Sequence, residues 1–140
     1  MNRDEIAKFL DERRDAWRMR DPVMLARGHQ DNGVVHSPIF GTIQGREAIE
    51  SSYRELFRTF SDWTLDEQED VIEDGRAVQV LTFHGTHTGT LFGMPGSGRR
   101  FSSTGVAVME FKDGKIARER RLYDFTSLLL QLGVLKAKPS

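Results

Sequence analysis

The sequence predicts a single α+β domain, residues 1–140, in which helices of the first half pack on one face of an antiparallel sheet formed by the second half. Apolar residues recur at helical spacing in the first half, which is interrupted by one short strand pair. The tract 82–124 is instead rich in β-branched and aromatic residues with glycine breaks. Asp74-Gly75 and Asp113-Gly114 stand between apolar runs, where glycine supplies the positive φ that tight hairpin turns need.

The first helix is predicted to begin after Asn2, which with Glu5 forms a capping-box pattern that satisfies free amides of the first turn. Asp21-Pro22 ends this helix and begins a short second one, because Asp suits the N-cap and Pro suits the first helical position. The apolar positions of the first helix fit the ~3.6-residue period and define one inward face: Ile6, Phe9, Leu10, Ala16 and Trp17.

Turn residues and periodicity predict the remaining elements. Residues 28–33 have turn composition, residues 34–40 are predicted as a strand, and residues 46–60 as an amphipathic helix. The apolar positions of that helix are Ile49, Tyr53, Leu56, Phe57 and Phe60. The strands of the sheet are expected at 63–72, 77–88 and 106–111, followed by a return strand after Lys115 that ends at Tyr123-Asp124.

The composition limits the classes of partner and the compartment. Twenty basic and 21 acidic residues give a net charge of −1, which provides no broad electrostatic attraction for nucleic acid or an anionic membrane. The chain has no cysteine, so disulfides and thiolate metal sites are excluded. The first helix is charged where a signal peptide would be apolar, and no run approaches the ~20 apolar residues of a membrane span. We expect a cytoplasmic protein with a small-molecule substrate.

Four short segments of the second half stand in a characteristic order: Gly85-Thr86-His87-Thr88-Gly89, Gly93-Met94-Pro95 with Gly98, Phe111-Lys112-Asp113-Gly114-Lys115-Ile116, and Asp124 followed by residues 128–133. In this order they resemble segments of the SnoaL-like polyketide cyclase, or ester cyclase, family within the nuclear transport factor 2-like superfamily. The resemblance extends over the whole chain, because residues 45–49 and 60–63 resemble the start and the end of the family's third helix.

This resemblance implies a cone-shaped fold in which a strongly curved sheet wraps around helices and leaves a deep apolar pocket at its open end. It also implies a homodimer, and an intramolecular aldol condensation that needs no metal or cofactor. The aspartate that the family's cyclases use as acid and base corresponds to Asp124. Family members often have Trp where this chain has Arg120, and a charged side chain in the pocket would change the substrate.

The expected site combines the resemblance with strand alternation. In residues 77–87 we place the odd positions toward the helices, because Leu81 and Phe83 are the largest apolar groups and the resemblance places His87 in the pocket. Asp124 and His87 are the expected catalytic residues, and they should share one cavity with Phe83 and Leu122. The expected substrate-binding residues are His36, Trp17, Phe60, Phe83, Phe101, Met109, Arg120 and Leu122.

Structural interpretations of these residues stay open as well. Asp124 precedes a predicted helix, so its carboxylate could cap that helix instead of moving a proton. His84 and His87 form an H-x-x-H pattern, but a spacing of three on a strand places them on opposite faces, so no metal site is predicted. His87 alone could make a structural hydrogen bond. The arginines in 118–121 could form a solvated strand face or a clamp for a substrate carboxylate.

Two functions fit these features. The first is an enzyme that moves a proton beside a carbonyl for aldol closure or isomerisation, with Asp124 as the proton carrier and His87 orienting the carbonyl. The second is a non-catalytic small-molecule-binding or assembly module of the same fold, which an Asp124 engaged as a cap and a His87 bonded away from any cavity would favour. In either case we expect a homodimer through the outer face with Val78, Val80 and Val106, because that face left in water would be a sizeable apolar patch.

Overall fold

Ten elements follow one another in the computed structural model, which describes residues 1–136 and 138, without the side chains of residues 67 and 68. In chain order they are α1 (Arg3–Met19), α2 (Pro22–Arg27), β1 (His29–Ser37), β2 (Gly41–Gln44), α3 (Arg46–Thr59), β3 (Thr64–Glu73), β4 (Arg76–Thr86), β5 (Arg100–Lys112), β6 (Lys115–Tyr123) and α4 (Phe125–Leu132). The predicted division into a helical first half with one short strand pair and a second half of long strands is confirmed.

Local signals at the ends of the elements act as predicted. Asn2 Oδ1 accepts a hydrogen bond from the Glu5 amide at 2.9 Å, and the Asn2 amide donates to Glu5 Oε1 at 3.2 Å, which completes the capping box of α1. The Asp21 carboxylate caps α2 by accepting from two amides at 3.1 Å. Gly75 and Gly114 have φ values of 78° and 80° at the β3–β4 and β5–β6 hairpins.

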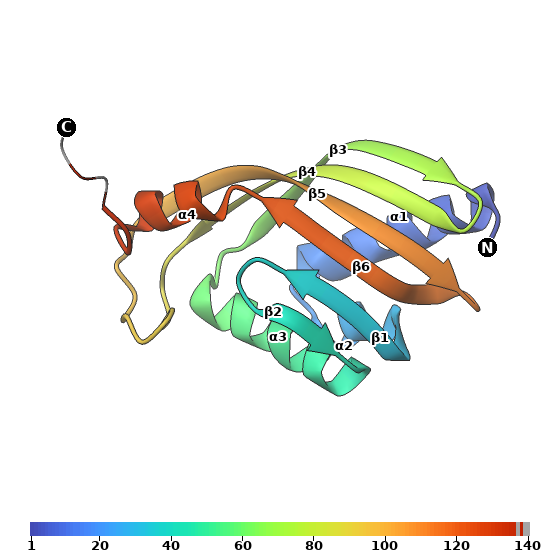
Figure 1. Ribbon diagram of the computed structural model, residues 1–140, viewed down its shortest axis with the longest axis horizontal. Helices are drawn as coiled ribbons and strands as arrows, with labels where there is room; N and C mark the ends of the chain where they lie inside the picture. Colours follow the sequence, from blue (N-terminus) through green and yellow to red (C-terminus); the bar gives the residue numbers. More distant parts are fainter. Residues whose placement is uncertain (137, 139–140) are drawn as a thin grey trace.

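The sheet is mixed, which corrects the expectation of a wholly antiparallel one. Its strand order is β2-β1-β6-β5-β4-β3, and β1 runs parallel to β6 while the other neighbours are antiparallel. His29 pairs with Ile116 of β6, so β1 begins in the segment 28–33 that has turn composition, and its register shifts before Val34. The sheet curves, with α1, α2 and α3 on one side and α4 near the C-terminus (Figure 1).

The inner face of the sheet carries the core. In β4 and the residue after it the odd positions Ala77, Gln79, Phe83, Gly85 and His87 are buried, whereas the even positions from 78 to 86 are partly buried. Leu81 is partly buried too, but the predicted orientation of this strand is confirmed. An aromatic cluster lies where β4, β5 and α3 meet, and it contains Phe60, Trp63, Phe83 and Phe101.

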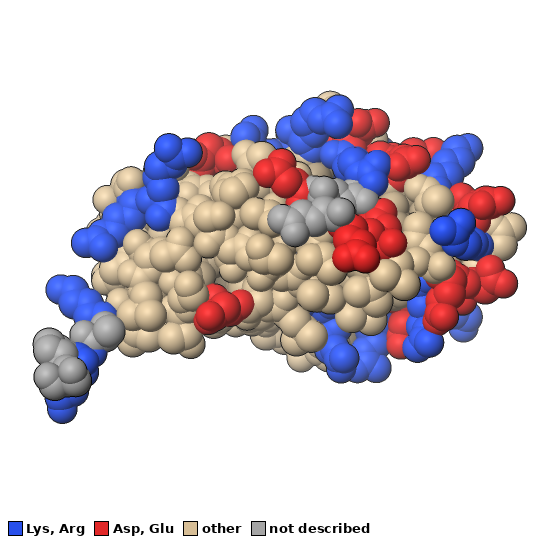
Figure 2. All heavy atoms as spheres, turned by 90° about the horizontal axis from the view of Figure 1, so that it is seen from above, with Lys and Arg blue, Asp and Glu red and all other residues tan. Residues whose placement is uncertain are grey.

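The surface carries both signs of charge. On the side that Figure 2 shows, acidic and basic side chains surround a broad uncharged area. This mixture agrees with the net charge of −1. No helix in the described part of the chain combines the length and the apolar character that crossing a bilayer requires.

Candidate functional site

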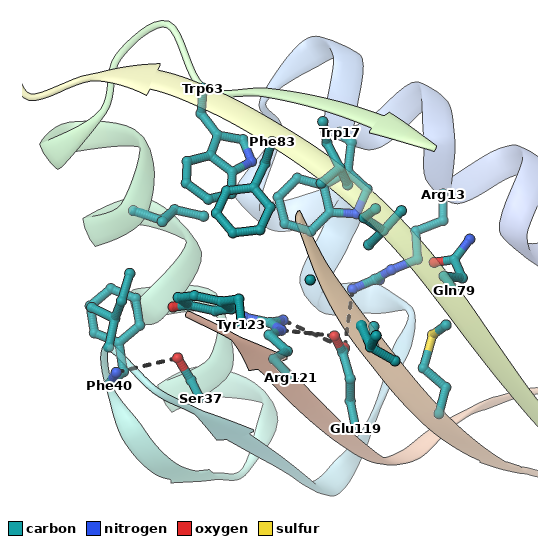
Figure 3. Close-up of a pocket in the computed structure, with 18 residues that line it drawn as sticks. Arg13, Trp17, Ser37, Phe40, Trp63, Gln79, Phe83, Glu119, Arg121 and Tyr123 are labelled. Atoms are coloured by element: carbon teal, nitrogen blue, oxygen red, sulfur yellow. Dashed lines mark hydrogen bonds and ion pairs between the residues drawn. The ribbon is translucent and has the colours of Figure 1, made fainter. Parts of the chain in front are cut away.

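A cavity of about 70 Å³ lies between α1 and the inner face of the sheet, and Figure 3 shows the side chains around it. Most of its wall is apolar and aromatic, contributed by Trp17, Ile39, Phe40, Leu56, Trp63, Leu65, Leu81, Phe83, Ala107 and Met109. Its polar groups come from α1, β1, β4 and β6, namely Arg13, Ser37, Gln79, Glu119, Arg121 and Tyr123. An apolar pocket with a few converging polar groups is the usual form of a small-molecule site.

The charged part of the wall is an ion-paired group from two elements. Arg121 Nε donates to Glu119 Oε2 at 2.7 Å, and Arg13 Nη2 lies 3.6 Å from Glu119 Oε1. Only 3% of Glu119 is exposed. Burial by itself would raise the pKa of Glu119, but the positive charges of Arg121 and Arg13 outweigh it and hold this pKa well below its usual range. Glu119 is therefore ionised at neutral pH.

Two further polar residues support this group from behind the cavity wall. Arg121 Nη2 donates to the Tyr53 hydroxyl at 2.9 Å, Arg13 donates to the same hydroxyl, and Tyr53 Oη lies 2.8 Å from His29 Nε2. Burial, and next the charge of Arg13, lower the pKa of His29 to about 3, so its ring is neutral. The charged groups at this end of the cavity are therefore the guanidinium groups of Arg13 and Arg121 and the carboxylate of Glu119, which gives this end a net positive charge.

The other end of the cavity is aromatic. Trp63 and Phe83 are stacked, with ring centroids 5.0 Å apart and an angle of 19° between the ring planes. Tyr123 meets Phe83 edge to face at 5.2 Å. Burial raises the pKa of Tyr123 to about 12, so its hydroxyl keeps its proton and can donate or accept a hydrogen bond. The cavity thus has one charged end and one aromatic end.

The structure brings some of the predicted site residues to this cavity. Trp17, Phe83 and Met109 line it. Phe60 and Phe101 belong to the aromatic cluster and pack against Trp63, each with a centroid distance of 5.8 Å, but they do not line the cavity.

The two residues predicted to be catalytic lie elsewhere. Asp124 is exposed and caps α4, because its Oδ1 accepts from the Ser127 amide at 2.9 Å. His87 is buried, with 1% exposed, and its Nδ1 accepts from the Ser97 amide at 3.3 Å. Neither residue lines the cavity. The expectation that they share it with Phe83 is wrong in position. A part of Asp124 in turnover is a separate matter, which substitution of this residue tests.

Three more predicted residues point to the outer face. Leu122 is 51% exposed, Arg120 is exposed, and neither lines the cavity. His36 pairs with Arg120 in the parallel ladder, and its Nδ1 lies 3.2 Å from Thr42 Oγ1 on β2. The placement of these residues in the pocket was therefore wrong, and Arg121, not Arg120, is the arginine of β6 that faces the cavity.

A one-residue bulge in β6 explains the error for Arg120 and Leu122. Phe111 of β5 pairs with Ile116 and the preceding Glu110 pairs with Arg118, so Ala117 is an extra residue. Such an insertion exchanges the two faces of the strand beyond it. Ile116 is buried, and after the bulge the odd positions of β6 turn inward.

Sequence reasoning missed Arg13 and Glu119, and it considered Arg121 only as one of the arginines of 118–121 that could bind a substrate carboxylate. A signal for Arg13 was present, because it continues the inward face of α1 at helical spacing from Ile6 and Leu10. No comparable signal marks Glu119 and Arg121, because the bulge that turns them inward has no glycine or proline to announce it.

Comparison with known proteins identifies a family and several relatives of this chain. A family model described as SnoaL-like polyketide cyclase matches residues 7–132. The chain is 34% identical over 99 residues to aklanonic acid methyl ester cyclase DnrD of Streptomyces peucetius, which covers 70% of this chain and 66% of DnrD. It is 42% identical over 76 residues to nogalonic acid methyl ester cyclase of Streptomyces nogalater, covering 54% and 57%. The chain therefore spans just under two thirds of the length of DnrD and less than that of the nogalonic acid methyl ester cyclase.

Solved structures share the whole fold. TsrD from Streptomyces laurentii superposes with a TM-score of 0.83 at 27% sequence identity, and the match covers 96% of this chain and 99% of TsrD. AclR from Streptomyces galilaeus also gives a TM-score of 0.83, at 23% identity, with 98% and 86% covered. The arrangement of helices and curved sheet is thus the one found in these proteins.

Proposed function

Because the chain belongs to the SnoaL-like polyketide cyclase family, we propose that it closes a carbon ring of a carbonyl-rich small molecule by an intramolecular aldol reaction. The curated relatives carry the names of cyclases for methyl esters of aklanonic and nogalonic acid. The proposed substrate class is accordingly a polyketide ester with an enolisable ketone. The observation that carries the proposal is the ion-paired group of the buried Arg13 and Glu119 with the partly buried Arg121 in the wall of an apolar cavity.

The proposed reaction is an isomerisation that conserves every atom of the substrate. A C–H bond beside a carbonyl breaks, its proton passes to the protein, and its electron pair forms an enolate. The enolate carbon attacks a second carbonyl carbon of the same molecule, so one carbon–carbon bond forms and that carbonyl becomes an alkoxide. The alkoxide then takes the proton back as a hydroxyl group.

Glu119 is the proposed proton carrier, because it is the one carboxylate among the described residues that line the cavity. Its lowered pKa makes it a weak base in the resting protein. When Glu119 accepts the proton, its charge disappears while a negative charge arises on the enolate oxygen. The positive charges of Arg13 and Arg121 then stabilise the enolate oxygen in place of the Glu119 carboxylate. The same two arginines therefore weaken Glu119 as a base and stabilise the enolate that it forms. Fixed charges aimed at developing charge are a large source of catalysis.

The apolar wall is proposed to fold the substrate. Trp17, Phe83 and Met109 face the same cavity as the ionic group. Holding the two reacting carbons of a flexible chain close together can lower a barrier by ~7–11 kcal/mol. A site with few chemical groups is therefore sufficient for a ring closure.

The size of the cavity restricts which part of the substrate enters it. A volume of about 70 Å³ is far below the ~300–1,000 Å³ of typical ligand pockets. Trp17, Trp63 and Leu65 line both this cavity and an open groove of about 600 Å³ between α1 and β3. We propose that the reacting chain occupies the cavity and that fused rings extend past these three side chains into the groove.

Turnover of the two methyl esters tests the proposal. Incubation with each ester, followed by chromatography and mass spectrometry, should reveal a product of unchanged mass and altered retention. Glu119→Gln protein at the same concentration is the control for spontaneous closure. A product that forms no faster with wild-type protein than in buffer would contradict the proposed activity.

A non-catalytic binding module is the second candidate function. The cap formed by Asp124 and the bond between His87 and Ser97 support it, because this arrangement is the one expected of such a module. A binding module would take up the same esters and return them unchanged. Equilibrium dialysis combined with the turnover assay separates the two candidates.

We further propose a homodimer formed through the outer face of the sheet. Val78 pairs with Val108 and Val80 with Val106, so four valines form a continuous apolar strip on β4 and β5. Arg118 and Arg120 of β6 lie on one side of this strip, and acidic residues of β3 lie on the other, namely Asp66, Glu69 and Glu73. A two-fold axis that runs along the strip, parallel to β4 and β5, would set the arginines of each copy over the acidic residues of the other.

A further inference from the structure

Three buried side-chain nitrogens in the described part of the chain have no hydrogen-bond partner: His29 Nδ1, Trp63 Nε1 and His87 Nε2. Only Trp63 belongs to a residue that also lines the cavity. Trp63 is 6% exposed, so its N–H is shielded from bulk water. An unpaired buried donor is unfavourable and is expected to be satisfied when the site is occupied.

The position of this indole is determined from several sides. Its ring stacks on Phe83, its carbonyl accepts from Arg20 Nε at 2.9 Å, and its amide donates to the Phe60 carbonyl at 3.1 Å. In Figure 3 its nitrogen is on the edge of the ring that faces the other cavity-lining side chains. The two hydrogen bonds fix the main chain of Trp63, and the rings of Phe60, Phe83 and Phe101 that pack against its indole hold the N–H in this direction.

The chemistry of the surroundings selects the kind of atom that pairs with it. An indole N–H only donates, so its partner must be an acceptor. The neighbours of Trp63 are the rings of Phe60, Phe83 and Phe101, among which an unpaired negative charge would be costly. Arg13 and Arg121, which suit an anionic oxygen, stand beside Glu119 on the other side of the cavity (Figure 3). A neutral carbonyl oxygen fits the Trp63 end.

We propose that the Trp63 indole N–H donates a hydrogen bond to a ketone or ester carbonyl of the substrate and thereby determines specificity and orientation. The carbonyl at the aromatic end places the enolisable part of the molecule at the arginine end. Analogues that lack this oxygen leave the N–H unpaired and bind more weakly. The proposal rests on the proposed cyclase function for its substrate class and adds the residue that recognises the carbonyl.

A matched pair of phenols tests this without any turnover. Para-hydroxyacetophenone has a ketone, and para-ethylphenol has nearly the same shape without the oxygen. The chain has two tryptophans, so a proton–nitrogen correlation spectrum contains two indole resonances, and Trp17→Phe identifies the one of Trp63. Titration of wild-type protein with the ketone should move the Trp63 indole proton downfield, and para-ethylphenol should not. Equal shifts with both compounds, or none up to the solubility limit, would overturn the proposal.

Affinity measurements on Trp63→Phe give an independent readout, since this change keeps an aromatic ring beside Phe83 and removes the donor. The variant should bind para-hydroxyacetophenone about tenfold more weakly and para-ethylphenol within about twofold of wild type. Equal losses for both compounds would count against a carbonyl contact. If Trp63→Phe does not fold, the wild-type titration decides alone. Failure of the cyclase assay together with a ketone-dependent indole shift would refute the proposed function and leave carbonyl recognition standing.

Discussion

Glu119 and Arg121 stand two residues apart on β6 with both side chains on the inner face, and Arg121 Nε donates to Glu119 Oε2 at 2.7 Å. Residues at this spacing share one face of a strand, so the strand itself presents an ion pair to the cavity. Arg13 of α1 lies 3.6 Å from the other carboxylate oxygen and links the helix to the sheet. Stability and the proposed turnover therefore depend on the same pair.

Glu119→Gln should reduce both the stability of the fold and the rate of the proposed ring closure. The change leaves the guanidinium groups of the buried Arg13 and the partly buried Arg121 without their anion, which is expected to cost about 3–5 kcal/mol of unfolding free energy. Loss of the proton carrier should slow ring closure by about 10²–10⁴-fold. Urea unfolding and single-turnover assays measure the two effects. Glu110→Gln, an exposed position on β5, is the matched control and should behave as wild type. An unchanged rate in folded Glu119→Gln would remove Glu119 from the mechanism.

His29 should make stability depend on pH. Its pKa is about 3 in the folded protein and 6.5 as the unperturbed value, so between these values the unfolded chain binds the extra proton. The contribution of His29 to the unfolding free energy is therefore fully present above pH 6.5. It falls as the pH decreases, by about 2.5 kcal/mol between pH 7 and 4.5. Urea unfolding across this range measures the slope.

Urea unfolding of two variants over the same pH range shows whether His29 causes the pH dependence of the unfolding free energy. In His29→Gln the dependence between pH 6.5 and 4.5 should largely disappear, because the titrating group is gone. His84→Gln changes a partly exposed histidine on the outer face and should keep the wild-type slope. A slope that is the same in all three proteins would show that another group causes it.

Asp124 can be tested as a cap and as a catalyst with two substitutions. Asn is a good N-cap, so Asp124→Asn should melt close to wild type, whereas Asp124→Ala should lose about 0.5–2 kcal/mol. Because Asp124 is exposed and outside the cavity, we expect Asp124→Asn to retain ring closure. A loss of about two orders of magnitude in Asp124→Asn turnover would restore the acid and base role that the family resemblance implies for it.

The outer face of the sheet should hold two copies together. Val78→Glu places a charge in the middle of the valine strip and should convert the dimer into a monomer, because an unpaired carboxylate would be buried at the contact. Sedimentation equilibrium gives the mass of each protein. Met19→Glu changes a side chain on α1 that is 66% exposed and should leave the dimer intact. A monomeric wild-type protein at high concentration would refute this assembly.

The sequence by itself determined the order and type of the elements, because the signals involved are local. A cap such as Asn2 with Glu5, a turn glycine such as Gly114, and the periodicity of residues 46–60 each act over a few neighbouring residues. The inward face of β4 could also be predicted, because its alternation is uninterrupted from Ala77 to His87. Family membership followed from the order of short motifs.

Only the tertiary structure decided which residues of β6 face the cavity. Alternation predicts a face only as long as the ladder is regular, and the extra residue Ala117 exchanges the faces, so Arg121 turns in and Leu122 turns out. The parallel pairing of β1 with β6 likewise joins segments far apart in the chain, which no local pattern specifies. The buried ion pair between Arg13 and Glu119 joins a helix to a strand more than 100 residues later in the chain. Only the packing of α1 on the sheet brings these two side chains together.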